Sequence, residues 1–392
     1  MSGARSWSRD EALALAGASG HRPLDLSLGI PCDPPPRVPG AAHTSRQPRA
    51  RVTAAYPPSA GTPQLRDAIT GYLLRRYAVA VPPEAVAACV GSKEFISTLP
   101  LFLRDLTQQH ARGAGRDTVL IPALGYPSYA FGARLAGLRV HRVPVDETFR
   151  IRLDRIAPHV VSRALCLWVN SPANPTGVVE DLDRVAAWGR AHGVLVVSDE
   201  AYAETTWCHE PRTVLRGGLD GVLTVHSLSK RSNAPGLRVG FYAGDPTLVA
   251  GLVHRRRQGG LMAAAASQQF AASLLADDRH AAEQRSRNAR RVSDLVDRLN
   301  ALGLPCASPA GGLFAWVAAP EGGGRAFAHH AAAHAGVVVT PGSEFGPRGD
   351  GYVRIAAVHD LSAIASRLAL LRPAAARRRS ADPSDTASQE SQ

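Results

Sequence analysis

Five short apolar runs in the middle of the chain constrain the fold more than any other feature of the sequence. They cover residues 119–122, 165–170, 194–199, 222–226 and 239–243. Each run is continuously apolar rather than alternating, which is typical of parallel strands that are covered on both faces. A helical pattern over residues 182–192 lies between two of the runs. This strand–helix–strand order predicts a parallel α/β sheet.

The segments on either side of these runs predict a further helix before them and a second, smaller domain after them. Thr62 is a suitable N-cap, Pro63 suits the first helical position, and Leu65, Ile69 and Leu73 follow on one helical face. A long helical pattern over residues 261–302 leads to expected strands at residues 311–317, 337–340 and 351–356, and to a final helix near residues 360–371. Since 392 residues exceed what one hydrophobic core usually serves, two domains are expected.

The expected domain limits follow this pattern. The large domain covers residues 56–275, and the small domain combines residues 25–55 with residues 276–372. Residues 1–24 form a partly flexible N-terminal segment. Residues 373–392 are rich in Ala, Ser and Arg and lack apolar periodicity, so they are predicted to be a disordered tail.

Composition argues against several classes of protein. No apolar run approaches the roughly 18 residues of a membrane helix, and the N-terminus lacks a secretory signal, so a cytoplasmic protein without membrane partners is expected. The five cysteines include no C-x-x-C pair, which argues against disulfides and thiolate metal sites. The net charge of +12 comes without a nucleic-acid-binding motif, so no nucleic-acid partner is expected. His330 and His334 have metal-ligand spacing but no third ligand, and no metal is expected.

A lysine stands at the end of one apolar run. Lys230 follows residues 222–226 in the polar turn S-L-S-K, where burying an ammonium group is costly unless the amine is neutral or covalently bound. Lysines with a lowered pKa are those that form Schiff bases. Ser227, Ser229 and Arg238 are residue types that bind a phosphate dianion. Taken alone, the segment is also compatible with a surface loop that carries an incidental lysine.

Two further runs end in polar residues that can bind an aromatic ring with a pyridine nitrogen and a phenolic oxygen. Asp199 ends one of them, and a carboxylate there can pair with a protonated pyridine nitrogen and make the ring an electron sink. Tyr202 can donate to a phenolic oxygen of such a ring, and Asn174, in the turn-rich segment 170–177, can contact the same oxygen. All these residues follow predicted parallel strands, where ligands of open α/β sheets bind.

Together these motifs resemble those of a known family. N-x-P-x-N-P-T-G from Asn170, D-E-x-Y from Asp199, and S-x-S-K-x-x-x-x-x-G-x-R from Ser227 resemble the signature of class I/II aminotransferases, the fold-type-I pyridoxal-phosphate (PLP) enzymes. The resemblance extends from about residue 25 to residue 371. It implies an α/β fold in which helices sandwich a mostly parallel seven-stranded sheet, with a smaller α+β domain. It also implies a pyridoxal 5'-phosphate cofactor, amino-acid and keto-acid substrates, and a homodimer.

The resemblance also implies roles for individual residues. Lys230 would hold PLP as a Schiff base and act as general base, with Asp199 and Tyr202 as the other catalytic residues. Arg354 would grip the substrate α-carboxylate, with Gly29 and Asn174 also at the substrate. The cofactor-binding set implied by the resemblance comprises Gly91, Ser92 and Lys93 at the phosphate, Tyr126 on the ring, Tyr56 reaching the phosphate of the partner subunit, and Asn174, Asp199, Tyr202, Ser227, Ser229, Lys230 and Arg238.

The substrate stays open at this point. Among subgroups the chain is most similar to succinyldiaminopimelate aminotransferases, but it departs from them in the basic segment 41–53, at Pro235 and Leu237, and in an insertion at residues 108–116. A paralogue of specialised metabolism is therefore an alternative. Arg46, Arg49 and Arg51 either attract an anionic substrate to the active-site mouth or form a solvated loop, and the loop is favoured.

Two other activities compete with transamination. One is a PLP-dependent elimination, replacement or carbon–carbon bond-forming reaction in a biosynthetic pathway, because the outcome depends on pocket geometry. The other is a non-catalytic PLP-binding regulatory or scaffold domain, which the presence of the lysine, the aspartate and both arginines argues against.

Overall fold

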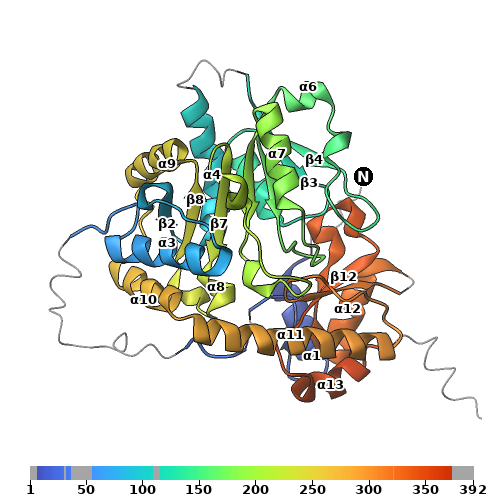
Figure 1. Cartoon of the computed structure of the whole chain (residues 1–392). Coiled ribbons are helices and arrows are strands. Elements are labelled where there is room, and N and C mark those ends of the chain that lie inside the picture. Colours follow the sequence, from blue (N-terminus) through green and yellow to red (C-terminus); the bar gives the residue numbers. More distant parts are fainter. Residues whose placement is uncertain (1–6, 31, 37–54, 109–114, 321, 373–392) are drawn as a thin grey trace, which may run out of the picture.

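The structure, a computed structural model, describes residues 7–30, 32–36, 55–108, 115–320 and 322–372. Figure 1 shows a large domain built on a central sheet, and beside it a smaller domain that contains both the first and the last described elements. The predicted tail, the basic segment 46–51 and most of the insertion at residues 108–116 lie outside the described residues.

The central sheet of the large domain has seven strands, as predicted. Their order is β2-β8-β7-β6-β5-β3-β4. The neighbours from β7 to β4 pair in parallel, whereas β8 runs antiparallel to both β7 and β2. The strands are β2 (Val86–Cys89), β3 (Thr118–Pro122), β4 (Arg139–Val143), β5 (Ala164–Asn170), β6 (Leu195–Asp199), β7 (Val222–Ser227) and β8 (Gly240–Gly244).

Helices on both faces explain why the strands are continuously apolar. Leu120 and Leu167 belong to one buried cluster together with residues of α3 and α7. Val119 and Trp168, their sequence neighbours, point the other way into a cluster with residues of α4 and α5. The helices of this domain are α3 (Pro63–Tyr77), α4 (Ser92–Gln108), α5 (Ser128–Leu135), α6 (Pro158–Val161), α7 (Leu182–His192), α8 (Leu228–Arg231), α9 (Pro246–Gln258) and α10 (Ala265–Ala276).

The start of α3 confirms the capping prediction. The Thr62 hydroxyl accepts a hydrogen bond from the Leu65 amide at 3.3 Å, and Pro63 occupies the first turn. Leu65, Ile69 and Leu73 are all buried against the sheet. An N-cap of this kind stabilises a helix by about 1 kcal/mol.

The small domain combines both ends of the described chain. Strand β1 (Leu24–Asp25) pairs in parallel with β10 (Val337–Val338). A second sheet has the order β11-β12-β9, with β9 (Phe314–Ala318), β11 (Thr340–Pro341) and β12 (Tyr352–Ala356). The helices here are α1 (Arg9–Ala18), α11 (Asp278–Ala301), α12 (Gly323–Ala335) and α13 (Leu361–Ala369).

The long helical pattern expected over residues 261–302 corresponds to two helices, α10 and α11. Asp277 lies between α10 and α11, and its carboxylate accepts hydrogen bonds from the Arg279 and His280 amides at the start of α11. Helix α1 was not anticipated, and it packs against α12 through Ala16 and Ala332.

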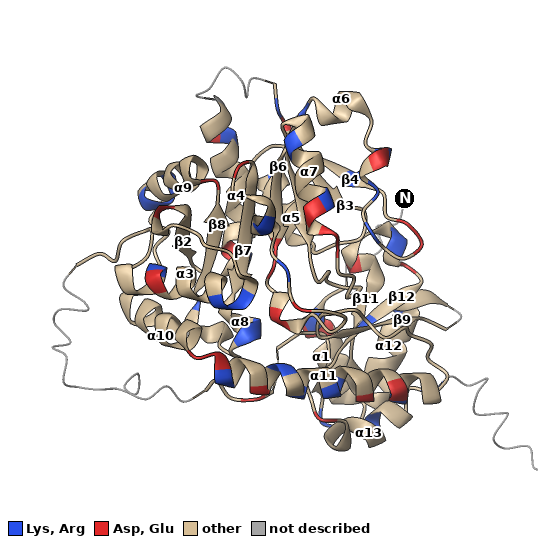
Figure 2. Cartoon of the chain, viewed as in Figure 1, with Lys and Arg blue, Asp and Glu red and all other residues tan. Residues whose placement is uncertain are grey.

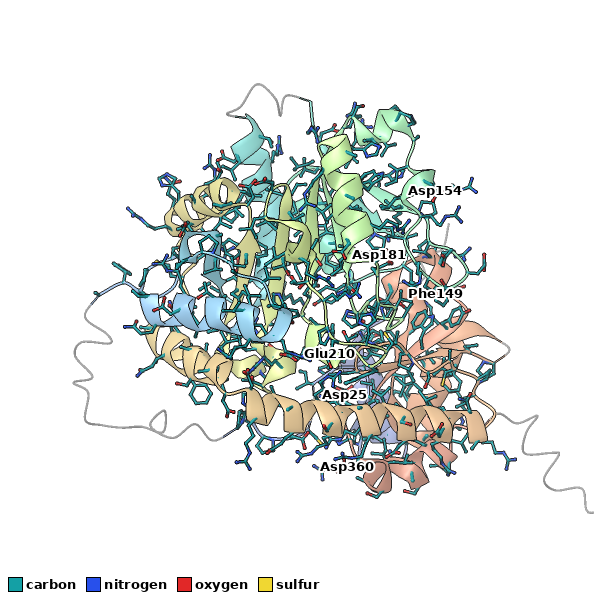
Figure 3. All side chains as sticks on the ribbon, viewed as in Figure 1. Asp25, Phe149, Asp154, Asp181, Glu210 and Asp360 are labelled. Carbon is teal, nitrogen blue, oxygen red and sulfur yellow. The ribbon has the colours of Figure 1, made fainter. Side chains whose placement is uncertain are left out.

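Short 3-10 helices make the remaining connections. They are η1 (Pro83–Ala85), η3 (Leu153–Arg155), η4 (Ala203–Thr205), η5 (Val214–Gly217), η6 (Pro235–Leu237), η7 (Gly342–Phe345) and η8 (Pro347–Gly349). Side chains fill the junction between the two domains (Figure 3), where Phe149 contacts Trp316 and Tyr352 edge-on.

Charged side chains lie mainly on the helices and loops. Lysine or arginine and aspartate or glutamate residues are interspersed along them, whereas the central strands carry few (Figure 2). Among the described helices, none combines the length and the apolar composition needed to span a bilayer. His330 and His334 stack on each other, and the described residues contain no cluster of three metal-ligating side chains.

Candidate active site

Polar residues meet where three neighbouring strands end. Asn170 of β5 pairs in register with Asp199 of β6, and Ser227 ends the next strand, β7. The Asn170 amide group donates to the Asp199 carbonyl oxygen at 2.8 Å, and its side-chain oxygen accepts from the Asn174 amide at 2.7 Å. Asn170 therefore ties the turn that carries Asn174 to the end of β6.

Lys230 lies directly after β7. Ser227 caps the short helix α8, in which Lys230 sits, by accepting a hydrogen bond from the Ser229 amide. The Lys230 Nζ donates to the Gly29 carbonyl oxygen at 2.6 Å and lies 5.7 Å from the centre of the Tyr202 ring. Burial, and then the positive charges of Arg354 and Arg238, lower the pKa of Lys230 to about 8. A substantial fraction of the amine is therefore neutral just above physiological pH, as a nucleophile or base requires.

Asp199 is a buried carboxylate with two fixed donors. The Tyr129 hydroxyl donates to Oδ2 at 2.8 Å, and the Ala201 amide donates to Oδ1 at 3.1 Å. Burial raises the pKa of Asp199 to about 6, while the Tyr129 hydrogen bond acts in the opposite direction. Tyr129 itself stacks on Trp168, with 4.9 Å between ring centres. Neither Tyr129 nor Asn170 was predicted as a site residue, although Tyr129 follows the predicted Tyr126 by only three residues.

Arg238 and Gly91 form a positively charged corner at the start of α4. The Arg238 guanidinium donates to the backbone oxygens of Pro235 and Val90, at 2.9 and 3.4 Å. It has no ion pair with any carboxylate of the described chain. A Cβ on Gly91 would lie 2.5 Å from the Arg238 Nη2, so only glycine leaves the guanidinium in place. Because α4 begins at Ser92, its first-turn amides are free for an anion here.

Arg354 comes from the small domain and is buried without a carboxylate partner in the described part of the chain. Its Nη1 donates to the Asn174 Oδ1 at 2.6 Å, and its Nη2 donates to the Ser27 carbonyl oxygen. The guanidinium carbon lies 4.2 and 4.8 Å from the ring centres of Phe314 and Phe345. Burial lowers the pKa of Arg354 to about 10. Buried charges are normally paired, so this guanidinium is available to an anionic group.

The remaining predicted residues divide into two groups. Tyr202 is buried edge-on against Phe314, and Gly29 is packed so closely that a Cβ would lie 2.6 Å from the Phe314 ring. Tyr126 is half-buried and meets Tyr129 edge-on at 5.8 Å. Lys93, by contrast, is exposed, and Tyr56 is 91% exposed. Lys93 nevertheless follows Ser92 in the first turn of α4, beside Gly91 and Arg238, whereas none of the contacts described above involves Tyr56.

Comparisons with known proteins agree with this arrangement. The sequence model of the family described as "Aminotransferase class I and II" matches residues 22–366. The 4-dedimethylamino-4-oxo-anhydrotetracycline transaminase OxyQ of Streptomyces rimosus is 37% identical, covering 85% of this chain and 88% of its own. A probable aminotransferase of Mycobacterium tuberculosis is 39% identical over 88% of this chain and 79% of its own. The structure of a probable N-succinyldiaminopimelate aminotransferase from Thermus thermophilus has a TM-score of 0.81 at 27% identity, covering 93% of this chain and 98% of its own.

Proposed function

The chain belongs to the class I and II aminotransferases, and from that premise we propose that it transfers amino groups at Lys230 with pyridoxal 5'-phosphate as cofactor. The family is PLP-dependent, and the activity of this chain is that of an aminotransferase. The observation that carries the proposal is the surroundings of the Lys230 amine, whose pKa is lowered to about 8. Its charged neighbours are the buried carboxylate of Asp199 and the guanidinium groups of Arg354 and Arg238, neither of which has a carboxylate partner among the described residues.

The residues present fit the chemistry of this cofactor. A phosphate dianion needs donors and positive charge, which the Arg238–Gly91 corner and the first turn of α4 supply. A pyridine nitrogen stays protonated beside a carboxylate, which Asp199 supplies. We propose that Lys230 holds the cofactor covalently and that the other contacts come from Tyr202 and Asn174 at the phenolic oxygen, Tyr126 on the ring, and Ser92, Lys93, Ser227 and Ser229 near the phosphate.

The chain's own groups then divide the work of the reaction. When bound, the cofactor supplies an electron sink for the bond that breaks at the substrate Cα. Lys230 takes the proton from that carbon and returns a proton, which its lowered pKa permits near neutral pH. Asp199, with a pKa of about 6, is ionised at neutral pH and holds its negative charge on the side where the ring nitrogen would lie. Tyr129 and the Ala201 amide keep that carboxylate in one orientation.

Arg354 is proposed to bind the α-carboxylate of the substrate. Its two terminal nitrogens already donate to Asn174 and Ser27, which holds the guanidinium plane between two aromatic rings. Planar guanidinium groups bind carboxylates as a bidentate fork. Arg354 belongs to the small domain and Asn174 to the large one, so the substrate would be bound between the two domains.

The amino donor and acceptor belong to one of two substrate classes. A succinyldiaminopimelate-type substrate is supported by the structural similarity to the Thermus thermophilus protein. A specialised-metabolism substrate is supported by the similarity to OxyQ, whose name assigns it a tetracycline intermediate. A screen of donors and acceptors against both classes decides between them.

We also propose that the protein is a homodimer. Tyr56 is 91% exposed, which leaves its side chain accessible to a second subunit. A Tyr56→Phe chain and a Lys230→Ala chain, each weakly active or inactive alone, should regain activity on mixing if Tyr56 serves the partner's site. Unchanged activity of Tyr56→Phe, or a monomer in sedimentation, would contradict the proposal.

The central experiment uses an unusual property of the sequence: Lys93 and Lys230 are its only lysines. The purified protein should be yellow, and borohydride should fix the cofactor onto a single lysine that peptide mass mapping assigns to Lys230. Lys93→Arg is the matched control and should still be labelled. Unreduced protein is then tested for turnover with amino acids and 2-oxo acids, with products identified by mass. Labelling of Lys93 alone, or release of a side-chain fragment instead of a keto acid, would overturn the proposal.

A further inference from the structure

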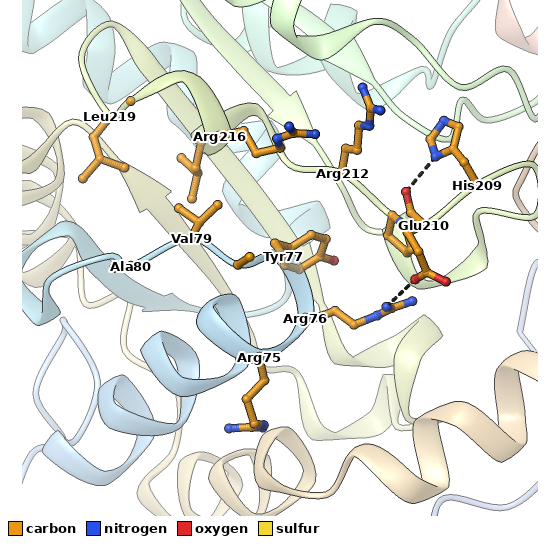
Figure 4. Close-up of a pocket in the computed structure, with 14 residues that line it drawn as sticks. Arg75, Arg76, Tyr77, Val79, Ala80, His209, Glu210, Arg212, Arg216 and Leu219 are labelled. Atoms are coloured by element: carbon orange, nitrogen blue, oxygen red, sulfur yellow. Dashed lines mark hydrogen bonds and ion pairs between the residues drawn. The ribbon is translucent and has the colours of Figure 1, made fainter.

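A second cavity lies outside the site around Lys230. It has a volume of about 770 Å³ and opens on the large domain between the end of α3 and the segment that leads into β7 (Figure 4). Its lining comes from residues 75–80 and residues 209–219, which include none of the residues assigned to amino-group transfer. Small-molecule pockets commonly have volumes of about 300–1,000 Å³.

The charged groups of this cavity are mostly basic. Arg76 is neutralised, because it donates to the carboxylates of Glu204 and Glu210 at 2.9 and 2.8 Å. Arg75 turns away toward Asp278, with which it forms an ion pair at 2.7 Å. Glu210 is the only carboxylate in the lining, and Arg76 already occupies it.

Two arginines of the lining lack any such partner. Arg212 and Arg216 are exposed, and within the described chain neither forms a hydrogen bond or ion pair through its side chain. In Figure 4 their side chains lie on the same side of the cavity, and no dashed line reaches either of them. Like charges on one side of a cavity repel each other, and an anion bound to both arginines would relieve that repulsion.

The rest of the lining is apolar and held in place. Tyr77 and Leu215 are buried, and Val79 and Leu219 pack beside them. The Tyr77 hydroxyl is within 3.0 Å of the Tyr72 hydroxyl, which in turn donates to Glu204 at 2.9 Å. The Tyr77 ring is therefore fixed by a hydrogen-bond chain, and it lies between Arg216 and Arg76 in Figure 4.

We propose that this cavity binds a small organic dianion, in which a phosphate ester or a pair of carboxylates is attached to an apolar body. Arg212 and Arg216 bind the anionic group, because guanidinium forks match both phosphate and carboxylate oxygens. Tyr77 and Leu219 contact the apolar body. The site is separate from the one proposed for the cofactor and substrate.

The test measures binding by calorimetry on the cofactor-saturated protein after borohydride reduction, which keeps the Lys230 site filled. Phenyl phosphate and phthalate are the two organic probes, and inorganic phosphate is the probe without an apolar body. The test variant is Arg212→Gln/Arg216→Gln. Its matched control is Arg134→Gln/Arg290→Gln, which removes two exposed arginines that lie outside the cavity.

We expect one molecule of phenyl phosphate or phthalate to bind per chain in the wild type and the control. Which probe binds more tightly shows whether the natural ligand is a phosphate ester or a dicarboxylate. Loss of one charge-assisted hydrogen bond weakens binding about tenfold, so the test variant should lose at least that much. Equal affinity in the test variant, no saturable binding of either organic probe, or equal affinity for inorganic phosphate would each overturn the proposal. Because the readout is binding and not turnover, failure here leaves the proposed transamination untouched.

Discussion

Replacing Arg354 by methionine separates the affinity for substrate from the stability of the fold. The guanidinium reaches from the small domain to Asn174, to whose Oδ1 it donates at 2.6 Å. Two charge-assisted hydrogen bonds to a carboxylate contribute about 1.5–3 kcal/mol each. Even the lower end predicts a loss of about a hundredfold in kcat/KM for α-amino acids and 2-oxo acids.

The stability of the same variant should change little, because two effects oppose each other. Burial lowers the pKa of Arg354 from its ordinary value to about 10, which corresponds to a cost of about 3 kcal/mol for keeping the charge in the folded state. Methionine relieves that cost. It also leaves the Asn174 Oδ1 without its Arg354 donor, at about 1–3 kcal/mol, whereas the Ser27 carbonyl oxygen keeps the hydrogen bond from the Thr340 hydroxyl at 3.1 Å. We expect the two contributions to offset each other to within about 2 kcal/mol.

Steady-state kinetics and urea unfolding measure the two quantities. Arg354→Lys is the matched control: it keeps the charge but loses the fork, so its kcat/KM should fall between those of wild type and Arg354→Met. A primary amine without a carboxylate, used as donor, should react equally with wild type and Arg354→Met. An unchanged kcat/KM for amino acids in Arg354→Met, with the cofactor still bound, would refute the assignment of the carboxylate to this residue.

Three further predictions concern the large domain. Tyr129→Phe removes the hydrogen bond that lowers the pKa of Asp199, so that pKa should rise above about 6. The acidic limb of the kcat/KM profile should therefore move to higher pH. An acidic limb that does not move would contradict the role of Tyr129. Gly91→Ala forces a positive φ of 81° on alanine and places its Cβ 2.5 Å from the Arg238 Nη2. With the fold retained, cofactor affinity measured by fluorescence titration should fall about tenfold. Equal affinity would count against phosphate binding by Arg238 and Gly91. In cofactor-free protein, acylation of Lys230 followed by mass mapping should be half-maximal near pH 8, since burial and two neighbouring arginines disfavour its protonated form; a midpoint near 10.5 would show that the amine is solvated.

Most of the sheet could be predicted because its local pattern reflects its environment. Strands β3, β5, β6, β7 and β8 have helices or other buried layers on both faces, so both sets of alternating side chains are apolar. Strand β4 was missed because it is an edge strand with exposed arginines at positions 139 and 142, and β2 was missed because its Val-Ala-Ala-Cys run is short and small. The antiparallel direction of β8 could not be predicted, because burial on both faces does not depend on strand direction.

The site also has residues that the sequence predicts and contacts that it does not predict. Asp199, Ser227 and Lys230 lie at strand ends, and the end of a buried run is visible in the sequence. The contacts that give these residues their properties join distant parts of the chain. The hydrogen bond between Tyr129 and Asp199 spans 70 residues, that between Asn174 and Arg354 spans 180, and that between Gly29 and Lys230 spans 201. Such pairs depend on how α5 and the small domain pack against the sheet, which no local pattern encodes.

The charges around Lys230 explain why one arrangement serves both the lysine and its ligands. Arg354 and Arg238 both lower the pKa of Lys230, and among the charged groups that affect it only Asp199 raises it. The site without ligands therefore carries more positive than negative charge, which favours a phosphate at Arg238 and a carboxylate at Arg354. Each anion that binds cancels one of the charges that lower the pKa of the amine. The basicity of Lys230 is therefore lowest when the site is empty, where a free amine is needed to capture the cofactor, and rises once a carboxylate occupies Arg354, when a proton has to be accepted.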